Sequence, residues 1–590
     1  MKLADYVADF LAQQGVGHVF LISGGAIIHC IDSVASHPKM TYICTQHEQA
    51  AGAAADAYAR VSGRVGCAMV TSGPGGTNLL TSICNAYFDS IPVIFICGQV
   101  ATFRLRPSDS LRQKGFQETD VTGIFKSVTK YAVLVKSAED IRYELEKALY
   151  LAREGRPGPV VLDIPDDLQR VDIDPEALRS FKAPQKMVTI DEERLKQLAD
   201  LIKNASRPLV IAGAGIRLSG SIDAFKHFVE ALSLPFCLTW GGMDIIERAH
   251  PLHQGPVGVC GPRSGNFAAQ NADLIISIGT RLSQMITGGK PNLFAPGARK
   301  VMIDIDPQEI AKFTPKEFVL DCAIQADLPS FFAAFRSHTP KLEQGQFKSW
   351  QDQIKVWAKQ YPICPPENYQ KLGRIDAYVF MKRLSALSKE GDLVMTDAGG
   401  NLSWTLQAFD VKKNQRLISA WNHSPMGYAL PGAMGATLVN GQDSLCIIGD
   451  GGIMMCLQEL GTIRRYNMPV KIFIMNNLGH GIQKQTIETW LNSRYVAVDQ
   501  ATGLYFPSFE RIAQGFDLPF VAIDNHQHLD EQLRKVLAMP GPVLCDVAID
   551  DKQRIIPMLK FGAGLEDLSP PLSPSEIEAA MQISRAGMRL

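Results

Sequence analysis

The sequence predicts an α/β protein made of three doubly wound parallel-sheet domains. Short apolar segments recur along the chain, and nearly all end in Gly, Asp, Asn or Ser before a helical pattern begins. Such alternation of buried strands and helices is typical of parallel sheets, which bind ligands at the carboxyl ends of their strands. The segments include GCAMVTSG, PVIFICGQ, PVVLDIP, PLVIAGAG, DLIISIGT, KVMIDIDP, LCIIGDGG and VKIFIMNN.

Length and composition agree with this prediction. At about 100–200 residues per domain, 590 residues correspond to three domains or so. A net charge of −1 gives no indication of nucleic-acid or membrane partners, and the apolar runs are shorter than the ~20 residues of a membrane span. The twelve cysteines form no CxxC pair and the N-terminus has no signal-peptide pattern, so we expect a cytoplasmic protein.

Two segments interrupt the alternation and are interpreted as linkers. Residues near 168–190 and 338–370 lack a strong hydrophobic period, and the second is rich in proline. The predicted domains therefore span residues 1–170, 190–338 and 371–555, followed by a tail over 556–590. In the tail, Ser573 and Glu576 form a capping-box pattern that predicts a short helix.

A GDG motif in the predicted third domain carries the strongest chemical signal. Asp450 follows one apolar strand and Asn477 follows the next, 27 residues later. One helix crossover has this length, so both side chains are expected at the same edge of adjacent parallel strands. A carboxylate and an amide oxygen form an incomplete oxygen site, which Mg²⁺ completes with phosphate oxygens. A bare GDG would be a tight turn, but its spacing from NN favours a diphosphate–Mg²⁺ site.

A glutamate opens the alanine-rich stretch HEQAAGAAADAYARVSG, residues 47–63. Small residues at helical spacing predict a buried helix face there. Glu48 at the first turn has two interpretations from the sequence. It is either an acid that interacts favourably with the helix dipole, or a carboxylate held in an apolar place for proton chemistry.

The chain resembles thiamine-diphosphate (ThDP) enzymes of the acetolactate synthase and pyruvate oxidase family over nearly its whole length. The likeness rests on GDG…NN, on TSGPGGTNLLTSICNAYFDSIPVIFICGQV and GFQETDV, and on HEQAAGAAADAYAR. The resemblance implies a pyrimidine-binding, a central FAD-type and a diphosphate-binding domain, with Mg²⁺ on the side chains of Asp450 and Asn477 and the carbonyl of Gly479. The implied ThDP-binding residues are Gly25, Glu48, Ser424, Met426, Gly449, Asp450, Gly451, Gly452, Asn477, Gly479, Gly481 and Ile482.

By the same resemblance, Glu48, Gln117 and Met426 have catalytic roles. Glu48 would hydrogen-bond N1′ of the aminopyrimidine, which favours the imino tautomer whose N4′ takes the C2 proton. Met426 would wedge between the two cofactor rings, although a methionine is also a common core filler. Gln117 would lie beside the substrate, or be an ordinary polar residue of a surface loop. The family places the glutamate and the metal site on different subunits, so a homodimer at least, or a tetramer, is implied.

The predicted central domain resembles the FAD-binding domain of the same family. Its segments AGAGI, ISIGTRL, MIDIDPQEI and QADL match in order and spacing, whereas the Gly-Ala-Gly turn alone would be weak evidence. The candidate FAD residues are Gly213, Gly215, Gly279, Arg281, Asp304, Asp306 and Asp327. Nothing in the sequence requires the flavin to be redox-active.

The sequence departs from the family on the acceptor side. Ser283-Gln284-Met285 replaces an Asp-Asp-Arg triplet, and Gln485-Thr486-Ile487 replaces a Gln-Trp-Glu run. We therefore expect a carboligase that decarboxylates pyruvate to hydroxyethyl-ThDP and transfers the acetyl unit to a ketone or keto sugar, similar to carboligases of the yersiniose-biosynthesis type. The expected acceptor pocket contains His29, Met285, His480 and Thr486, although each histidine is as readily structural.

Three other interpretations remain open. The chain could be an acetolactate synthase, with pyruvate as donor and acceptor and a different clamp for the acceptor. It could be a pyruvate oxidase-type flavoenzyme that passes electrons to FAD. A catalytically silent binding protein is disfavoured, because Glu48, Asp450, Asn477 and Met426 are all present.

Overall fold

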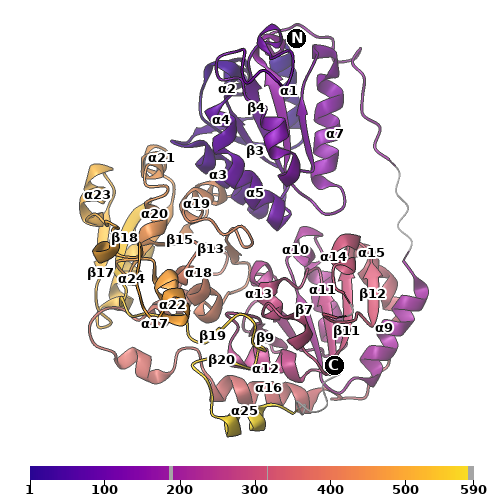
Figure 1. The fold of residues 1–590 in the computed structure, drawn as a ribbon, viewed down its shortest axis with the longest axis vertical. Helices are drawn as coiled ribbons and strands as arrows, with labels where there is room; N and C mark the ends of the chain where they lie inside the picture. The colour runs from indigo at the N-terminus through magenta and orange to yellow at the C-terminus, as the bar shows by residue number, and fades with distance from the viewer. Residues whose placement is uncertain (185–189, 315, 583–590) are drawn as a thin grey trace.

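Three six-stranded parallel sheets form the framework of the molecule, which confirms the predicted fold class (Figure 1). The computed structural model describes residues 1–184, 190–314 and 316–582. Each predicted apolar segment forms a strand, because a strand covered on both faces by helices must be apolar throughout.

The first sheet has the strand order β2-β1-β3-β4-β6-β5. Its strands are β1 (His18–Leu21), β2 (Thr41–Cys44), β3 (Gly66–Val70), β4 (Val93–Gln99), β5 (Tyr131–Leu134) and β6 (Val160–Pro165). The helices around it are α1 (Leu3–Gln13), α2 (Ile28–Ser36), α3 (Glu48–Ser62), α4 (Pro74–Asn78), α5 (Leu80–Asp89), α6 (Val121–Phe125), α7 (Ile141–Arg153) and α8 (Asp166–Gln169).

The second sheet has the order β12-β11-β10-β7-β8-β9. Its strands are β7 (Pro208–Ala212), β8 (Phe236–Leu238), β9 (His253–Pro256), β10 (Leu274–Ile278), β11 (Arg299–Asp304) and β12 (Cys322–Gln325). Its helices are α9 (Glu192–Asn204), α10 (Gly215–Leu218), α11 (Ile222–Ala231), α12 (Arg263–Asn271), α13 (Gln284–Thr287), α14 (Pro307–Ala311) and α15 (Leu328–Phe335).

The third sheet has the order β14-β13-β15-β16-β18-β17. Its strands are β13 (Leu393–Thr396), β14 (Arg416–Ile418), β15 (Ser444–Gly449), β16 (Val470–Asn476), β17 (Phe520–Ile523) and β18 (Val543–Ala548). Its helices are α17 (Ala377–Leu387), α18 (Gly400–Ala408), α19 (Ala429–Thr437), α20 (Asp450–Ile453), α21 (Glu459–Arg465), α22 (Gly481–Trp490), α23 (Phe509–Gly515) and α24 (Leu529–Ala538).

The interpretation of residues 338–370 as a linker is wrong. Helix α16 (Lys348–Gln360) occupies the middle of this segment and packs on α12. Trp350, Ile354 and Trp357 lie on one helix face and are buried, so the segment belongs to the core beside the central sheet. The prolines that suggested a linker lie outside this helix. The other predicted linker, near residues 168–190, begins at the end of α8, and its residues 171–184 contain no helix or named strand and run along the outside of the molecule (Figure 1). Its residues 185–189 lie outside the described part of the chain.

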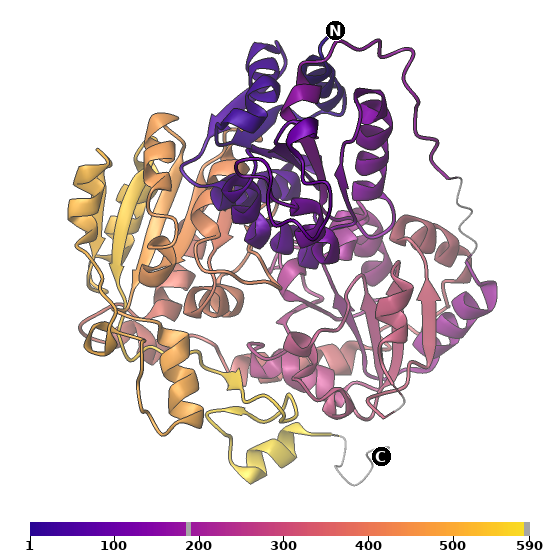
Figure 2. The same cartoon turned by 45° about the horizontal axis from the view of Figure 1, so that its top comes forward.

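The tail after residue 555 crosses from the third domain to the central one (Figure 2). It forms the small hairpin of β19 (Met558–Leu559) and β20 (Leu568–Ser569), then helix α25 (Pro574–Ala580). The predicted capping box is present, since the Ser573 hydroxyl accepts the backbone N–H of Glu576. Asn266 and Asn271 of α12 donate side-chain hydrogen bonds to the carbonyls of Leu565 and Ala580, which fix the tail on the central domain.

Helices α3 and α19 join the first and third domains through small residues (Figure 1). A Cβ added to Gly435 of α19 would lie 2.0 Å from the carbonyl oxygen of Ala54 in α3. This close approach explains the alanines and glycines of both helices, because larger side chains would separate the backbones. Among the described residues, no helix is long and apolar enough to cross a membrane.

Candidate active site

The GDG and NN motifs meet at the carboxyl edge of the third sheet, as their spacing predicts. Strands β15 and β16 pair in parallel with Gly449 opposite Met475, so Asp450 and Asn477 leave neighbouring strands at the same level. The Asp450 carboxylate accepts the backbone N–H of Gly451 at 2.7 Å and that of Gly479 at 3.0 Å. The loop after β16 is thereby held against the turn after β15.

Asp450 is a buried carboxylate whose charge is not balanced by a basic side chain. It is 1 % exposed, and Asn477 is 6 % exposed. Burial raises the pKa of Asp450 to about 7, and the N–H groups of Gly479 and Gly451 only partly oppose this rise. In the described part of the chain, no lysine or arginine forms an ion pair with Asp450. A divalent cation would supply the missing charge, so the residues present fit the Mg²⁺ site that the sequence predicts.

Glycines give the backbone around Asp450 its close packing. A Cβ on Gly479 would lie 2.5 Å from the carbonyl oxygen of Val498, and one on Gly481 would lie 2.5 Å from Nδ2 of Asn477. A Cβ on Gly451 would lie 2.6 Å from Nε2 of His480 and 3.1 Å from Cε of Met426. These positions leave no room for a side chain where the turn after β15, the loop after β16 and Met426 meet.

The loop before α19 brings Met426 to this edge. Met426 and His480 both lie over Gly451, so two residues predicted from distant segments are adjacent. Ser424 has a φ of 51°, a left-handed conformation that glycine adopts more easily. Serine is thus accommodated at this position in a backbone region that favours glycine.

Asp397 fixes the loop behind Met426 and was not predicted as a site residue. Its buried carboxylate accepts the backbone N–H groups of Gly427 and Tyr428, each at 2.9 Å, and of Ala429 at 3.1 Å. Burial nevertheless raises its pKa to about 6, because desolvation outweighs these hydrogen bonds. The signal in the sequence was an acid directly after the apolar strand LVMT, the pattern that identified Asp450.

Glu48 begins α3 at the carboxyl edge of the first sheet. The side chain of His47 caps the helix by accepting the N–H of Gln49, so Glu48 is not needed as the cap. Its carboxylate accepts a hydrogen bond from Nδ2 of Asn78 at 2.9 Å and is half-buried in this single chain. The helix therefore does not need Glu48 as its cap, and the role of this carboxylate as a cofactor ligand stays a prediction.

Gln117 lies beside the glycine-rich turn of the first domain. Gln117 has a φ of 62°. A Cβ added to Gly73 would lie 3.0 Å from the Cβ of Gln117. Glu118 stabilises this loop by accepting three backbone N–H groups, and these lower its pKa. Gly25, in contrast, has open space around its Cβ position, so packing does not require glycine there.

The predicted acceptor residues lie on elements of all three domains. His480 lies at the cofactor edge, and burial lowers its pKa. Thr486 is exposed on α22, where its hydroxyl donates to the carbonyl of Ile482. Met285 belongs to α13 of the central domain and His29 to α2 of the first. No hydrogen bond or ion pair that the described residues form joins these last two to His480.

The glycines of the central domain form a tight crossing at the ends of β7 and β10. A Cβ on Gly213 would lie 2.4 Å from the carbonyl oxygen of Gly279, and one on Gly215 would lie 2.8 Å from the Gly279 Cα. Gly279 has a φ of 56°, which favours glycine. This packing brings the start of α10 to the sheet edge, as a nucleotide site of this type requires.

The acids of the central domain already have protein partners. Asp306 caps α14 and pairs with Arg156 of the first domain at 3.0 Å, and Asp327 caps α15. The carboxylate of Asp304 accepts only the N–H of Asp306 among the hydrogen bonds of the described chain, and burial raises its pKa. Arg281 donates a hydrogen bond to Asn422 of the third domain. Of these candidates, Asp304 has the most free hydrogen-bonding capacity for a ribose.

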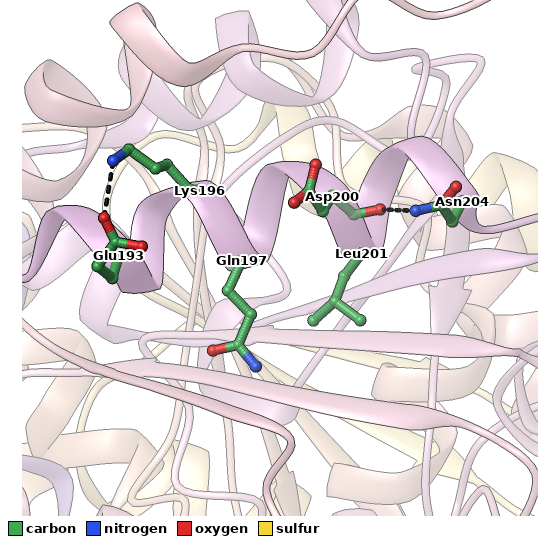
Figure 3. Close-up of a pocket in the computed structure, with 6 residues that line it drawn as sticks. All are labelled: Glu193, Lys196, Gln197, Asp200, Leu201 and Asn204. Atoms are coloured by element: carbon green, nitrogen blue, oxygen red, sulfur yellow. Dashed lines mark hydrogen bonds and ion pairs between the residues drawn. The ribbon is translucent and has the colours of Figure 1, made fainter.

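A shallow pocket of about 410 Å³ lies along α9, at a distance from these motifs in the sequence (Figure 3). Only residues of α9 line it, and the amine of Lys196 pairs with Glu193 on the first turns of the helix. None of the predicted site residues contributes to this pocket, so it is a surface feature of the helix.

Comparisons with known proteins agree with this geometry. The N-terminal thiamine pyrophosphate-binding domain model matches residues 1–124, the central domain model matches 195–335, and the C-terminal thiamine pyrophosphate-binding domain model matches 397–547. The chain belongs to the thiamine-diphosphate enzyme family. It is thus related to decarboxylating carboligases of this family.

Several acetolactate synthases are similar to this thiamine-diphosphate family member over almost the whole length of the chain. Acetolactate synthase isozyme 2 large subunit of Escherichia coli (strain K12) is 32 % identical over 574 residues, 97 % of this chain and 100 % of the relative. Acetolactate synthase 1, chloroplastic, of Oryza sativa subsp. japonica is 31 % identical over 577 residues, 96 % of this chain and 87 % of the relative.

Proposed function

We propose that this ThDP enzyme decarboxylates pyruvate and joins the remaining two-carbon unit to a second pyruvate, forming acetolactate. The similarity to acetolactate synthases along both chains supports pyruvate in both roles. The adjacency of Asp450, Met426 and His480 at one sheet edge supports the chemistry. The acetolactate interpretation therefore takes precedence over the expected ketone or keto-sugar acceptor.

Bound ThDP would supply a nucleophilic carbon and an electron sink for decarboxylation. Asp450, Asn477 and the Gly479 carbonyl would hold Mg²⁺ and orient the diphosphate. Glu48 would accept or share a proton at N1′ of the aminopyrimidine. Met426 would wedge between the two cofactor rings and so support their relative orientation. His480, beside Met426, would exclude water from the reacting carbonyl. Because Glu48 is half-buried in one chain, a second copy would complete its surroundings, which supports the expected homodimer.

FAD in the central domain is a further part of this proposal. The crossing of Gly213, Gly215 and Gly279 would admit a pyrophosphate, and Asp304 would accept a ribose hydroxyl. Asp306, Asp327 and Arg281 remain candidates, although each already serves a structural contact.

A ketone or keto-sugar acceptor is the second candidate, and specific residues favour it. Met285 offers no guanidinium to a carboxylate, and Thr486 is small and exposed where the family has tryptophan. Without the guanidinium and the tryptophan, the acceptor pocket would have more room for a large acceptor.

One assay separates the two candidates. The purified protein is supplied with ThDP, Mg²⁺, FAD and pyruvate, and CO₂ and acetolactate are measured without another acceptor. We expect acetolactate in a 1:2 ratio to the pyruvate consumed. CO₂ release that is slow with pyruvate alone and rises with an activated ketone or a keto sugar would contradict this and support the second candidate.

The role of Glu48 is tested by Glu48→Gln. We expect ThDP and Mg²⁺ to bind as before, while turnover falls by roughly 10²–10⁴-fold because N1′ loses its acid–base partner. The measurement combines calorimetric ThDP binding with pyruvate-dependent CO₂ release. Asn78→Ala, which removes the neighbouring hydrogen bond but keeps the carboxylate, is the control with a smaller loss. Near-normal turnover in Glu48→Gln would refute the assignment.

A further inference from the structure

Several contacts attach the loop that carries Ser424 and Met426 to the first domain, and three of them converge on one carboxylate. Asp89, the last residue of α5, accepts the backbone N–H of Trp421 at 2.8 Å and that of Asn422 at 3.1 Å. The side-chain amide of Asn422 donates to the same carboxylate at 2.6 Å. Three donors from one loop therefore converge on a buried acid of another domain.

Asp89 is itself held in place by a buried charge network. Arg60 of α3 pairs with Asp89 at 2.8 Å and with Asp56 at 2.6 Å, and the Tyr428 hydroxyl donates to Asp56 at 2.6 Å. All three charged side chains are almost fully buried. Such paired charges have one favourable arrangement, so the position of the Asp89 carboxylate is well defined.

The same loop is also held at its C-terminal end, residues 427–429, and by a contact from the central domain. Asp397 holds the backbone of residues 427–429, and Arg281 of the central domain donates to Asn422. Between these anchors lies Ser424, with a φ of 51°. Left-handed backbone at a residue other than glycine persists only where the surroundings fix it. Asp89 and Asp397 provide that constraint on either side of Met426.

We propose that Asp89 is a positioning residue for Met426. By anchoring Trp421 and Asn422, it sets where the loop presents the thioether of Met426 beside Gly451. This inference rests on the proposed function, in which Met426 supports the cofactor rings. It assigns to the first domain a second task besides carrying Glu48: control of the loop that shapes the cofactor in the third domain.

The test compares two variants that weaken the hydrogen bonds between Asp89 and residues 421–422 with one variant that leaves these bonds unchanged. Asp89→Asn removes one acceptor oxygen, and Asn422→Ala removes only an exposed side chain that donates to Asp89, so folding is preserved in the second variant. The matched control is Asp244→Asn. Asp244 is another buried interdomain acid that accepts a backbone N–H of the third domain, from Leu417, and pairs with Arg416.

The first readout is amide hydrogen exchange of residues 420–429 in the cofactor-free protein. We expect exchange about tenfold faster in Asp89→Asn and Asn422→Ala, because each loses one or two hydrogen bonds of the anchor. Asp244→Asn should change exchange at residues 416–418 and leave 420–429 as in the unmodified chain. Unchanged exchange in the two test variants, or an equal increase in the control, would overturn the inference.

The second readout is the exchange rate of the C2 proton of bound ThDP. In Asp89→Asn and Asn422→Ala this rate should fall about tenfold while ThDP affinity stays within about twofold, since the diphosphate contacts are untouched. A fall in affinity without a change in C2 exchange would also overturn the inference. If pyruvate were not a substrate at all, the proposed function would fail while the loop-exchange pattern remained, so the two failures are distinguishable.

Discussion

The carboxyl edges of the third and central sheets share a local design but differ in electrostatics. At both edges, a strand ends in a glycine-rich turn and a helix begins where backbones cross closely. At the third sheet, the acid of the turn, Asp450, has only backbone N–H partners. At the central sheet, Asp306 pairs with Arg156 and Asp327 caps a helix.

The difference shows what distinguishes a metal site from a structural turn. A buried carboxylate without a cationic side chain is costly unless a ligand supplies the charge. Asp450 is such a carboxylate, whereas Asp306 already has an arginine. Of the central acids, only Asp304 resembles Asp450, because burial raises its pKa and its protein partner is a single N–H.

The largest expected effect comes from Asp450→Ala. Loss of the one carboxylate in the oxygen site should weaken Mg²⁺-dependent ThDP binding at least about 100-fold, measured by calorimetry with and without Mg²⁺. Asp304→Ala, the equivalent change at the central sheet, should leave ThDP binding unchanged. If ThDP binding still depended on Mg²⁺ in Asp450→Ala, Asp450 would not be the metal ligand. The third-sheet edge would then not differ from the central one as a metal site.

A smaller effect is expected at the central sheet. Asp304→Asn should weaken FAD retention about tenfold, since one charge-assisted hydrogen bond to a ribose hydroxyl is lost. Asp306→Asn should mainly lower the melting temperature, because its carboxylate is engaged by Arg156 and by the N–H of Gln308. Flavin content and thermal unfolding of both variants provide the measurement. Equal flavin loss in both would show that Asp306 binds the flavin despite its ion pair.

The smallest effect is a pH-dependent change in stability of the cofactor-free protein. The pKa of Asp450 rises from 3.8 in the unfolded chain to about 7 when buried, so native stability falls as pH rises through this window. Asp450→Asn should therefore raise the melting temperature by about 3 °C above pH ~7, with the gain shrinking as pH falls toward ~4. Calorimetric scans across this range measure it.

The matched control for the pH series is Asp524→Asn, which changes an exposed acid. It should show no gain that varies across the same window. A stabilisation of Asp450→Asn that is the same at every pH would mean that the buried charge is not its cause.

Much of the fold and of the third-sheet edge was predictable because its determinants are local. The strand ends at Gly449 and Asn476, and one crossover between them fixes the placement of Asp450 and Asn477. Helix α16 was missed because surrounding prolines obscured the spacing of Trp350, Ile354 and Trp357. Asp89 could not be predicted as an anchor, because its partners lie more than 300 residues away in the sequence.

The sequence by itself determined the three parallel sheets, the diphosphate–Mg²⁺ motif and the helix that begins at Glu48, since each follows from hydrophobic period and the order of strands and turns. Only the tertiary structure decided which acids remain available. Arg156 reaches Asp306, and Asp89 reaches the loop of Met426, through contacts between domains, whereas Asp397 holds the same loop from within the third domain. Long-range packing sets the burial and partners of a charge, and these, not the residue type, decide whether it binds a ligand or fastens the fold.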